Sequence, residues 1–392
     1  MTLKLVRTAP ARIERRRVPG PPAAVCVPLL CLLALSSLAV MVTLSRHQEG
    51  PAAPPPPPLP AGRSRLYPRN GSLPGLGTFH YVINTDACTA DEEVTMLIVV
   101  TSHEGNQRLR SAWRRLLPTE ELGRLGARRV FLLGRPSQQE GYTSVNESLV
   151  ELESSQHGDI VQGDFSESYR NLTLKHLMGL RWAADYCPQA RYVVKMDDDI
   201  AVDVYQLHDK LTERYAPRDL LLGLIHYDMQ PVRDPASKWY VPTAEYPGEF
   251  YRPFLSGWMY VVSQDVITRL LAAAERRTNF WIDDVHVTGT LASDAGVRLS
   301  SLNAYYTPHA THLECCARTE DLLCDYLVGP AGGDEALLSD FLSQARGCWR
   351  AGCMRRKPEV SVARTCVGTD KYRHRELGQG TAEVVAVSWG AS

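Results

Sequence analysis

Three consecutive aspartates, Asp197, Asp198 and Asp199, stand in the stretch "RYVVKMDDDIAVD" (191–203). Carboxylates this close repel one another, so they persist either in open solvent or around a counter-charge. In an extended segment alternate side chains share a face, which would direct Asp197 and Asp199 one way and Asp198 the other. Two carboxylates on one face suit a hard divalent cation such as Mg²⁺ or Mn²⁺, and the oxygens of a diphosphate can complete its coordination. A solvated acidic turn is the alternative, and the spacing alone leaves both open.

A second acidic pair, Asp283-Asp284, lies among apolar residues in "NFWIDDVHVTG" (279–289). Its structural interpretation is an exposed turn or a helix N-cap. Its functional interpretation is a partly desolvated carboxylate that can take up a proton. Each acidic cluster, taken separately, is weak evidence for a site.

The elements that must position these acids alternate between strand and helix. Apolar residues spaced i, i+3, i+4, i+7 or i+8 predict helices over 172–187 and 265–277. Short apolar runs predict buried strands at 95–101, 128–134, 158–165, 191–196, 220–227 and 258–263. This alternation indicates an α/β fold with a mainly parallel sheet flanked by helices, in which ligands bind beyond the carboxyl ends of the strands. The triplet follows such a strand end. The sequence has no GxGxxG or GxxxxGK[ST] phosphate loop, which argues against a dehydrogenase or a kinase.

The N-terminal region predicts a membrane anchor. Residues 23–44 form a 22-residue, mainly apolar run, long enough for a helix to cross a bilayer. Basic residues cluster before this run, so the positive-inside rule places residues 1–22 in the cytosol and the rest in the lumen. A cleaved signal peptide is the alternative, but its apolar core is usually shorter. Seven prolines in the ten residues 51–60 then favour an extended stem over 45–90.

Two further features favour the lumen. N-glycosylation sequons begin at Asn70, Asn146 and Asn171. Eight of the ten cysteines follow the apolar run, and an even number in an oxidising compartment predicts disulfides, whose pairing the sequence leaves open. The late cysteines form no CxxC pair, which argues against zinc. The net charge of −1, with 22% charged residues, gives no basic surface typical of nucleic-acid binding.

Six segments, in order from Thr95 to Leu299, resemble the β-1,3-glycosyltransferases, a family of galactosyl- and N-acetylglucosaminyltransferases that includes the Fringe proteins. Each segment is only modestly specific, but six in series are highly specific. They are "RLRSAWR" (108–114), "VFLLG" (130–134), "GDIVQGDFSESYRNLTLKHLMGLRWAADYC" (158–187), "YVVKMDDDIAV" (192–202), "YPGEFYRPFLSGWMYVVSQDV" (246–266) and "IDDVHVTG" (282–289).

The resemblance implies a GT-A-type fold, a nucleotide-sugar-binding mixed sheet flanked by helices. It also implies a UDP-sugar donor, Mn²⁺ and transfer with inversion. Asp199 matches the family's direct metal ligand, and Asp284 matches the general base that removes a proton from the acceptor hydroxyl. A late histidine is a further metal ligand in the family, and this chain offers His309 or His312. Positions that match the donor site are Asp197, Asp198, Arg110 and Lys195. Ordinary helix packing is an equal alternative for Arg110 and Trp113.

The chain also departs from the family pattern. Gly257 matches a position where a sugar approaches the backbone, but the next residue is Trp258, where the family often has a small residue. This indole could stack on an acceptor sugar or fill core space. The segment after Asp284 carries one residue more before Gly289 than its commonest form. Beyond Leu299 the resemblance is lost.

We therefore expect a catalytic domain over 91–312, a cysteine-rich extension over 313–392, and a single-pass type II protein of the Golgi membrane held by residues 23–44. The expected activity is Mn²⁺-dependent transfer of galactose from a UDP-sugar to the 3-hydroxyl of a glycan on a glycoprotein or glycolipid. Transfer of N-acetylglucosamine or N-acetylgalactosamine is the alternative within this class. An inactive glycan-binding or chaperone relative is the alternative outside it, and the retained acids argue against it.

Overall fold

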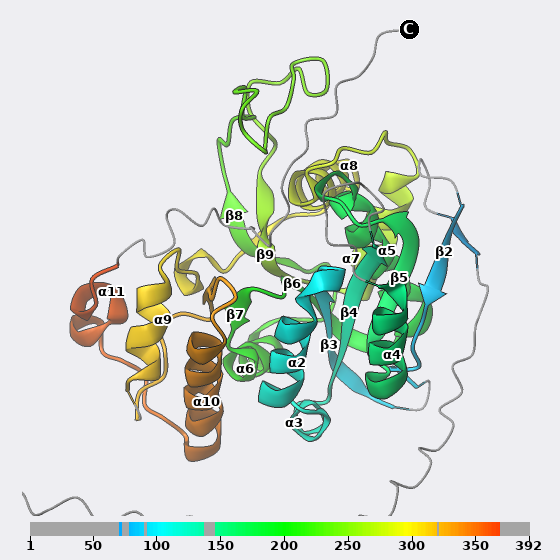
Figure 1. Cartoon of the computed structure of the whole chain (residues 1–392). Coiled ribbons are helices and arrows are strands. Elements are labelled where there is room, and N and C mark those ends of the chain that lie inside the picture. Colours follow the sequence, from blue (N-terminus) through cyan, green and yellow to red (C-terminus); the bar gives the residue numbers. More distant parts are fainter. Residues whose placement is uncertain (1–69, 73–77, 90–91, 137–145, 320, 369–392) are drawn as a thin grey trace, which may run out of the picture. The chain divides into compact units, whose positions relative to one another are not determined.

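The computed structural model describes residues 70–72, 78–89, 92–136, 146–319 and 321–368 (Figure 1). Among these residues, strands form a nine-stranded sheet in the order β1-β2-β5-β4-β3-β6-β9-β8-β10. Their bounds are β1 Asn70–Ser72, β2 Thr78–Ile83, β3 Val94–Thr101, β4 Ala127–Arg135, β5 Ile160–Ser166, β6 Ala190–Asp197, β8 Leu221–His226, β9 Phe254–Val262 and β10 Ser300–Ser301.

The centre of the sheet is parallel and its flanks are mixed. β5, β4, β3 and β6 run parallel, whereas β2 pairs antiparallel with β5, and β9 pairs antiparallel with β6 and β8. The prediction of a mainly parallel sheet is therefore right for the centre and wrong for the flanks. An apolar run predicts that a strand forms, but it does not predict whether the strand is parallel or antiparallel to its neighbours. That direction depends on the connections between strands.

Both faces of the central strands are buried, which explains their continuous apolar runs. Alternate residues of β3 enter two different cores: Met96, Ile98 and Val100 pack on one face, and Leu97 and Val99 on the other. Helices cover both faces (Figure 1). They are α2 Gln107–Leu116, α3 Thr119–Arg124, α4 Glu147–His157, α5 Leu172–Tyr186, α6 Val204–Arg214, α7 Gln264–Ala274, α8 Ala292–Asp294, α9 Ala310–Ala317, α10 Glu335–Ala351 and α11 Val362–Thr365.

Short helices join several of these elements. The 3₁₀ turns are η1 Glu104–Asn106, η2 Tyr169–Asn171, η4 Asn303–Tyr305 and η5 Pro358–Val360. A π-helix, η3, spans Val285–Leu291 and leads directly into α8. It occupies the segment that the sequence showed to be one residue longer than the commonest form. A π-helix winds more residues into each turn than an α-helix, so it accommodates such an extra residue without breaking the helix.

The cysteine-rich region shares strand pairing and a hydrophobic core with the main sheet. β11 (Val328–Pro330) pairs antiparallel with β7 (Ile200–Val202), the strand that follows the aspartate triplet. Leu337, Phe341 and Leu342 of α10 share one hydrophobic core with β3 and β6. Residues on both sides of the expected boundary at 312/313 thus belong to one folded unit, because apolar residues of this region supply a layer that the sheet needs on that face.

Disulfides form as expected, and the structure supplies the pairing that the sequence left open. The bonds are Cys88–Cys187, Cys315–Cys366, Cys316–Cys324 and Cys348–Cys353. The first ties the segment before β3 to the end of α5. The other three disulfides join residues within the cysteine-rich region.

Several expectations concern residues outside the described part of the chain. The tail 1–22, the apolar run 23–44, most of the stem and residues 369–392 lie there. Within the described ranges, no helix combines the length and the apolar character that crossing a bilayer requires.

Two of the three sequon asparagines have described side chains. Asn146 is exposed and caps α4 by accepting a hydrogen bond from the Ser148 amide. The side-chain amide of Asn171 donates to the Ser166 carbonyl, and the sequon's Thr173 is buried. Glycosylation of Asn70, Asn146 and Asn171 stays a prediction.

Candidate active site

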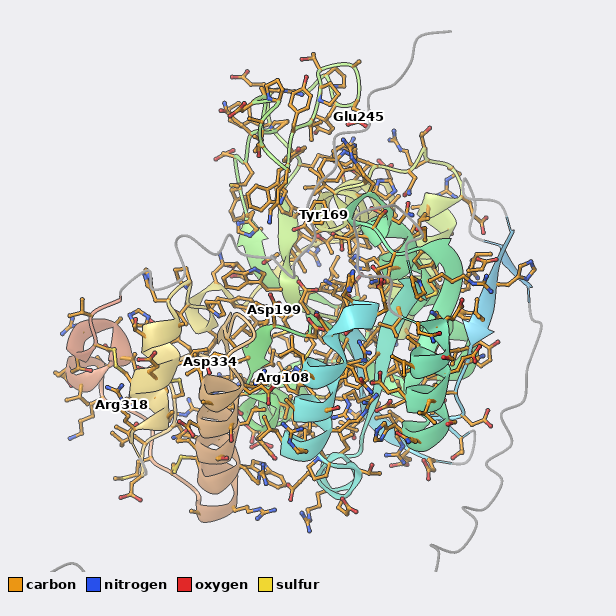
Figure 2. All side chains as sticks on the ribbon, viewed as in Figure 1. Arg108, Tyr169, Asp199, Glu245, Arg318 and Asp334 are labelled. Carbon is orange, nitrogen blue, oxygen red and sulfur yellow. A yellow bond between two sulfur atoms is a disulfide. The ribbon has the colours of Figure 1, made fainter. Side chains whose placement is uncertain are left out.

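The aspartate triplet lies where β6 ends at the edge of the sheet. Asp197 is the last residue of β6, opposite Thr101 of β3, and residues 198–199 form a turn into β7. The carboxylates of Asp197 and Asp198 bind different partners, Lys195 and Ser102 respectively, as strand alternation predicted. The extended segment expected through Asp199 is absent, however, because the chain turns after Asp197. Figure 2 shows Asp199 at this turn.

Asp198 is buried and held by the loop that follows β3. Its Oδ2 accepts hydrogen bonds from Ser102 Oγ at 2.6 Å and from Asn106 Nδ2 at 3.0 Å. Its carbonyl accepts from Trp113 Nε1 at 2.8 Å. Burial raises the pKa of Asp198, and the hydrogen bonds from Ser102 and Asn106 oppose that rise. Asp198 therefore fixes the turn, and its contact with the donor stays a prediction.

Arg110 lies beneath this loop, fully buried. Its guanidinium makes five hydrogen bonds: two to Glu153 at 2.7 and 2.8 Å, and three to Ser102 Oγ and the carbonyls of His103 and Glu104. Five bonds use all the donors of an arginine. In this structure Arg110 positions the loop that holds Asp198, and Trp113 does the same from α2. A direct contact of Arg110 with the donor stays a prediction.

Lys195 links the triplet to β9. Its buried Nζ donates to Asp197 Oδ1 at 2.8 Å and to the Gly257 carbonyl at 2.6 Å. Burial alone would lower the pKa of Lys195, but the charges of Asp197 and Asp283 raise it above its ordinary value. Lys195 therefore stays charged and lies between the two acidic clusters.

Unlike Asp197, Asp199 takes part in none of the ion pairs found among the described residues. Burial, together with the charges of Asp198 and Asp197, raises the pKa of Asp199 to about 7. Its backbone carbonyl accepts hydrogen bonds from the amides of Ala331 and Gly332, in the loop before α10. The cysteine-rich region thus holds the backbone of the residue predicted to bind the metal.

The described residues contain no group of three or more histidine, cysteine, aspartate or glutamate side chains placed to hold a metal ion together. Mg²⁺ and similar hard cations commonly take one or two protein carboxylates and complete their shell with phosphate oxygens and water. A pair of carboxyl groups, Asp197 and Asp199, beside a strand end fits that mode. The repulsion that raises the pKa of Asp199 is the kind that a cation relieves.

The two late histidines lie side by side at the start of α9, with ring centroids 5.1 Å apart. His312 Nδ1 contacts Thr307 Oγ1 at 2.7 Å, and its ring stacks on Tyr326. The amide of Thr307 donates to the carbonyl of Val328, the first residue of β11. The residues just after β11, Ala331 and Gly332, bind the carbonyl of Asp199. A role of His309 or His312 as a metal ligand stays a prediction, with both residues open.

The second acidic pair opens the helix that contains η3. Asp284 accepts hydrogen bonds from the Val285 amide at 2.8 Å and from the Gly257 amide at 3.3 Å. Asp283 Oδ2 lies 2.9 Å from Nδ1 of His176. The expected helix N-cap is present, since Asp284 caps η3, and the same residue faces Gly257.

The environments of these two carboxyl groups separate their pKa values. For Asp283, burial favours the neutral form, but the hydrogen bond from His176 and the charge of Lys195 lower the pKa to about 2. For Asp284, burial and the negative charge of Asp283 raise the pKa to about 7. A carboxylate with a pKa near neutrality is suited to general-base catalysis.

Gly257 keeps the space between the two clusters open. A Cβ at this position would lie 3.5 Å from Asp284 Oδ2 and 3.7 Å from Lys195 Nζ. Trp258, on the other face of β9, is half-buried and packs against the core that contains α10. This placement supports core filling for Trp258; an acceptor contact stays a prediction.

Several aromatic residues lie near the Asp283-Asp284 pair. The excursion 227–253, between β8 and β9, extends beyond the sheet (Figure 1). Its Trp239 donates to Tyr169 Oη at 2.6 Å, and its Glu245 accepts from Arg170 and from Trp281 Nε1. Burial and the charge of Asp283 raise the pKa of Tyr169. Figure 2 marks Tyr169 and Glu245 at this junction.

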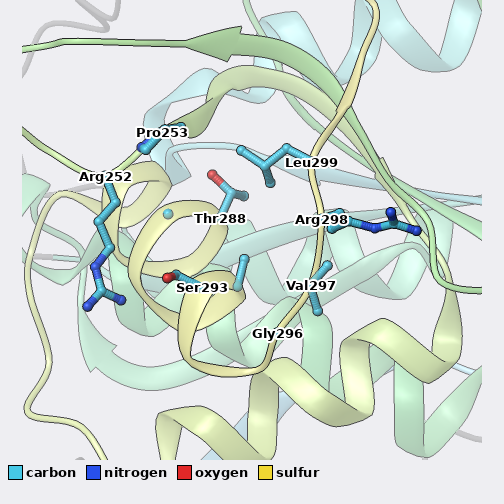
Figure 3. Close-up of a pocket in the computed structure, with 10 residues that line it drawn as sticks. Arg252, Pro253, Thr288, Ser293, Gly296, Val297, Arg298 and Leu299 are labelled. Atoms are coloured by element: carbon cyan, nitrogen blue, oxygen red, sulfur yellow. The ribbon is translucent and has the colours of Figure 1, made fainter.

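A separate pocket of about 500 Å³ lies farther along the helix that carries Asp284 (Figure 3). Its lining includes Arg252, Thr288 and Arg298 but none of the predicted site residues. Arg252 pairs with Asp294, and the arginine side chains point away from Thr288. This pocket therefore lies apart from the two acidic clusters.

Sequence reasoning missed Ser102, Asn106, His176 and Tyr260. Ser102 and Asn106 follow the predicted strand 95–101, so the rule that ligands and polar groups gather at strand ends could have found them. His176 and Tyr260 lie inside a helix and a strand, and nothing in their spacing distinguishes them from core residues.

Comparison with known proteins agrees with this geometry. The family model described as Galactosyltransferase matches residues 106–303, which contain the triplet, Gly257 and the Asp283-Asp284 pair. The chain belongs to the β-1,3-glycosyltransferase family. Residues 304–392 lie beyond the family match.

Three curated members of the β-1,3-glycosyltransferase family illustrate the similarity. β-1,3-Galactosyltransferase 5 of Pan paniscus is 31% identical over 308 residues, which cover 76% of this chain and 92% of that protein. Lactosylceramide 1,3-N-acetyl-β-D-glucosaminyltransferase of Xenopus tropicalis is 34% identical over 57% of this chain and 60% of its own length. β-1,3-Galactosyltransferase 4 of Mus musculus is 32% identical over 65% of this chain and 75% of that protein.

Among solved structures, the bifunctional glycosyltransferase WbbM aligns over 66% of this chain and 51% of its own, with 12% identity and a TM-score of 0.36. This likeness is too low to support a functional argument. The assignment to the β-1,3-glycosyltransferase family therefore comes from the sequence comparisons.

Proposed function

We propose that this protein transfers galactose from UDP-galactose to the 3-hydroxyl of an acceptor sugar on a glycoprotein or glycolipid, with inversion and in the presence of Mn²⁺. The observation that carries the proposal is the link between its two acidic clusters. Asp197 binds Lys195, Lys195 binds the Gly257 carbonyl, and the Gly257 amide binds Asp284. Sites separated by more than eighty residues in sequence thus form one connected polar centre around a glycine.

In this centre Asp284 is the general base. Its carboxylate takes the proton from the acceptor hydroxyl as that oxygen forms a bond to the anomeric carbon of the donor. The bond between the anomeric carbon and the diphosphate oxygen breaks, and UDP leaves with the bonding electrons. Attack from the side opposite UDP inverts the anomeric configuration. Gly257 leaves room for the sugar between Asp284 and Lys195.

Asp199 would hold the Mn²⁺ ion, with His309 or His312 as the candidate further ligand and Asp197 close by. When bound, the ion supplies positive charge that stabilises the departing diphosphate. Asp198 and the loop held by Arg110 shape the adjacent donor pocket, and Lys195 adds a second positive charge.

The acceptor would bind on the side of Tyr169, Trp239 and Trp281. The faces of a pyranose that carry only C–H bonds are apolar and pack well on aromatic rings. These rings lie next to Asp283 and Asp284, so a sugar resting on them could present a hydroxyl to the base.

N-Acetylglucosamine is the alternative donor sugar, supported by the similarity to the lactosylceramide N-acetylglucosaminyltransferase. N-Acetylgalactosamine is a further alternative. An inactive glycan-binding or chaperone relative is the alternative from another class. It is disfavoured because Asp197, Asp198, Asp199 and Asp284 are all present and linked by hydrogen bonds or charge. The luminal Golgi location, with residues 23–44 as anchor, belongs to the same proposal.

The test is a screen of the purified full-length chain against UDP-galactose, UDP-N-acetylglucosamine and UDP-N-acetylgalactosamine, each with a panel of glycan acceptors, with and without Mn²⁺. The proposal predicts transfer from UDP-galactose that chelation of Mn²⁺ abolishes. Transfer from another donor would replace the sugar but keep the reaction class. Absence of transfer and of UDP binding would overturn the class.

A further inference from the structure

His176 is a buried imidazole that the proposed reaction does not yet use. It lies on α5, is 2% exposed, and its Nδ1 is 2.9 Å from Asp283 Oδ2. Its other ring nitrogen, Nε2, contacts the hydroxyl of Tyr260 on β9. Tyr260 is completely buried. These contacts form a chain from Tyr260 through His176 to the carboxylate next to the proposed base.

The two neighbours of His176 require one tautomer. An ionised carboxylate only accepts hydrogen bonds, so Nδ1 must carry a proton to bond to Asp283. A neutral tyrosine hydroxyl can donate, so Nε2 accepts from Tyr260. Burial lowers the pKa of His176 despite the charge of Asp283, and burial raises the pKa of Tyr260, which supports neutral forms of both. Tyr260 thereby fixes the orientation of the imidazole, and the imidazole fixes Asp283.

Two adjacent carboxyl groups at one helix start would otherwise share a proton or compete for the same donors. Here each group has its own partners. Asp283 turns toward His176, and Asp284 turns toward the amides of Gly257 and Val285. The carboxylate beside Gly257 is therefore always that of Asp284.

We propose that His176 is a positioning residue for the transfer reaction: held by Tyr260, it keeps Asp283 turned away and so leaves Asp284 as the single base that faces the acceptor. This inference rests on the proposed function, because it assigns His176 a role in that reaction. It also makes a claim about the hydrogen-bonded chain itself, which is measured without any substrate.

The first test is steady-state kinetics of variants in the full-length chain. His176→Leu removes the donor to Asp283 and should lower kcat by about 10- to 100-fold, while the KM for the UDP-sugar changes less than about threefold. His176→Asn keeps a donor near the position of Nδ1 and should recover most of kcat. Trp182→Phe is the matched control on the same helix: it removes a partly buried hydrogen bond, from Trp182 Nε1 to Asn84, and should leave kcat unchanged.

The second test is a double-mutant cycle with Asp283→Asn. If His176 acts through Asp283, then His176→Leu should cause no further loss of kcat in the Asp283→Asn background. Three results would each overturn the positioning role. They are a double variant whose loss of kcat is the product of the two single losses, an equal loss of kcat in the Trp182→Phe control, and an unchanged kcat in His176→Leu.

The third test needs no activity and so separates this inference from the proposed function. In ¹⁵N-histidine-labelled protein, His176 should appear in NMR spectra as the neutral Nδ1–H tautomer. Its ring proton should shift upfield in Asp283→Asn, whereas Tyr260→Phe should keep the Nδ1–H tautomer and shift the Nε2 resonance, because Nε2 loses its hydrogen bond. An Nε2–H tautomer in the wild-type chain would overturn the inference even if the enzyme transfers galactose. Lack of transfer with every UDP-sugar would instead overturn the proposed function, leaving the tautomer to decide whether the chain through His176 exists.

Discussion

Burial and the charge of Asp283 raise the pKa of Asp284 to about 7, into the neutral range. A general base works only when ionised, so the direction of the pH effect follows. If Asp284 is the general base, its protonation below about pH 7 should slow the transfer, and its ionised form at higher pH should support it.

We therefore predict that kcat rises about tenfold between pH 6 and pH 8 and then levels off. The measurement is kcat at saturating donor and Mn²⁺, so that the metal site stays filled across the range. A flat profile between pH 6 and pH 8 would contradict the assignment of Asp284 as a base with this pKa.

Asp199 makes a different prediction at the same scale. Asp199→Ala should remove the Mn²⁺-dependent part of UDP binding, because this carboxylate is the proposed metal ligand. Calorimetric titration with UDP, with and without Mn²⁺, measures the effect. Ser301→Ala, which removes an exposed hydroxyl at the far edge of the sheet, serves as the control. Normal Mn²⁺-dependent affinity in Asp199→Ala would show that the triplet is not the metal site.

At the scale of elements, α2 holds the loop that follows β3, which binds Asp198, through a buried ion pair. Arg110 and Glu153 are 0% and 2% exposed, and Arg114 also binds Glu153. Arg110→Met should lower the free energy of unfolding by about 2–4 kcal/mol, since it leaves loop carbonyls unbonded and weakens the neutralisation of Glu153.

Chemical denaturation of this variant provides the measurement. The matched control on the same helix is Arg108→Met, because the side chain of Arg108 is 86% exposed. Its pairing with Glu335 should contribute less than about 1 kcal/mol. Equal effects of the two substitutions would argue against a special role for the buried pair.

Thr288 of the π-helix η3 forms hydrogen bonds to the backbone of β9. Thr288 Oγ1 accepts from the Leu255 amide at 2.8 Å and contacts the carbonyls of Leu255 and Asp284. Thr288→Val keeps the shape but removes these bonds, so it should destabilise the protein by about 1–3 kcal/mol in denaturant unfolding. Unchanged stability would show that the wide helical turn does not depend on this residue.

At the scale of the whole molecule, the cysteine-rich region and the catalytic domain share one core. Phe341 of α10 is fully buried in the core that also contains β3 and β6. Phe341→Ala should cost about 3–5 kcal/mol of unfolding free energy. It should also lower the midpoint for loss of UDP binding, because the loop before α10 holds the backbone of Asp199.

The measurement is denaturant unfolding followed by near-UV circular dichroism and by UDP binding in parallel. The two probes should shift together in Phe341→Ala. A separate early transition that leaves UDP binding intact would mean that the region after 312 is an independent appendage.

Features of the fold that depend on local sequence could be predicted, and features that depend on distant parts of the chain could not. The central strands could be predicted, since apolar runs such as 95–101 are buried on both faces. The triplet at the end of β6 followed from the same reasoning. Strand direction could not, because it depends on the connections between strands. The turn after Asp197 could not either, because it leads into β7, whose partner β11 lies more than a hundred residues away.

The limits for the site have a similar cause. Asp199 and Asp284 stood out because acidic clusters are rare among apolar residues and because the ordered motifs resemble a family. His176 and Tyr260 did not, since their importance arises only when α5 and β9 meet. From the sequence, only the composition of the cysteine-rich region could be described, and its role could not be predicted. Its helices complete a hydrophobic core whose remaining residues, on β3 and β6, lie far away in sequence.

The most direct test of the central claim is the transfer rate of Asp284→Asn compared with the wild-type chain, measured with UDP-galactose, Mn²⁺ and an accepted glycan. The amide keeps the size of the side chain but cannot take up the proton. We predict a loss of kcat of about 10²- to 10⁴-fold with Mn²⁺-dependent UDP binding unchanged. Turnover equal to that of the wild-type chain would contradict the account.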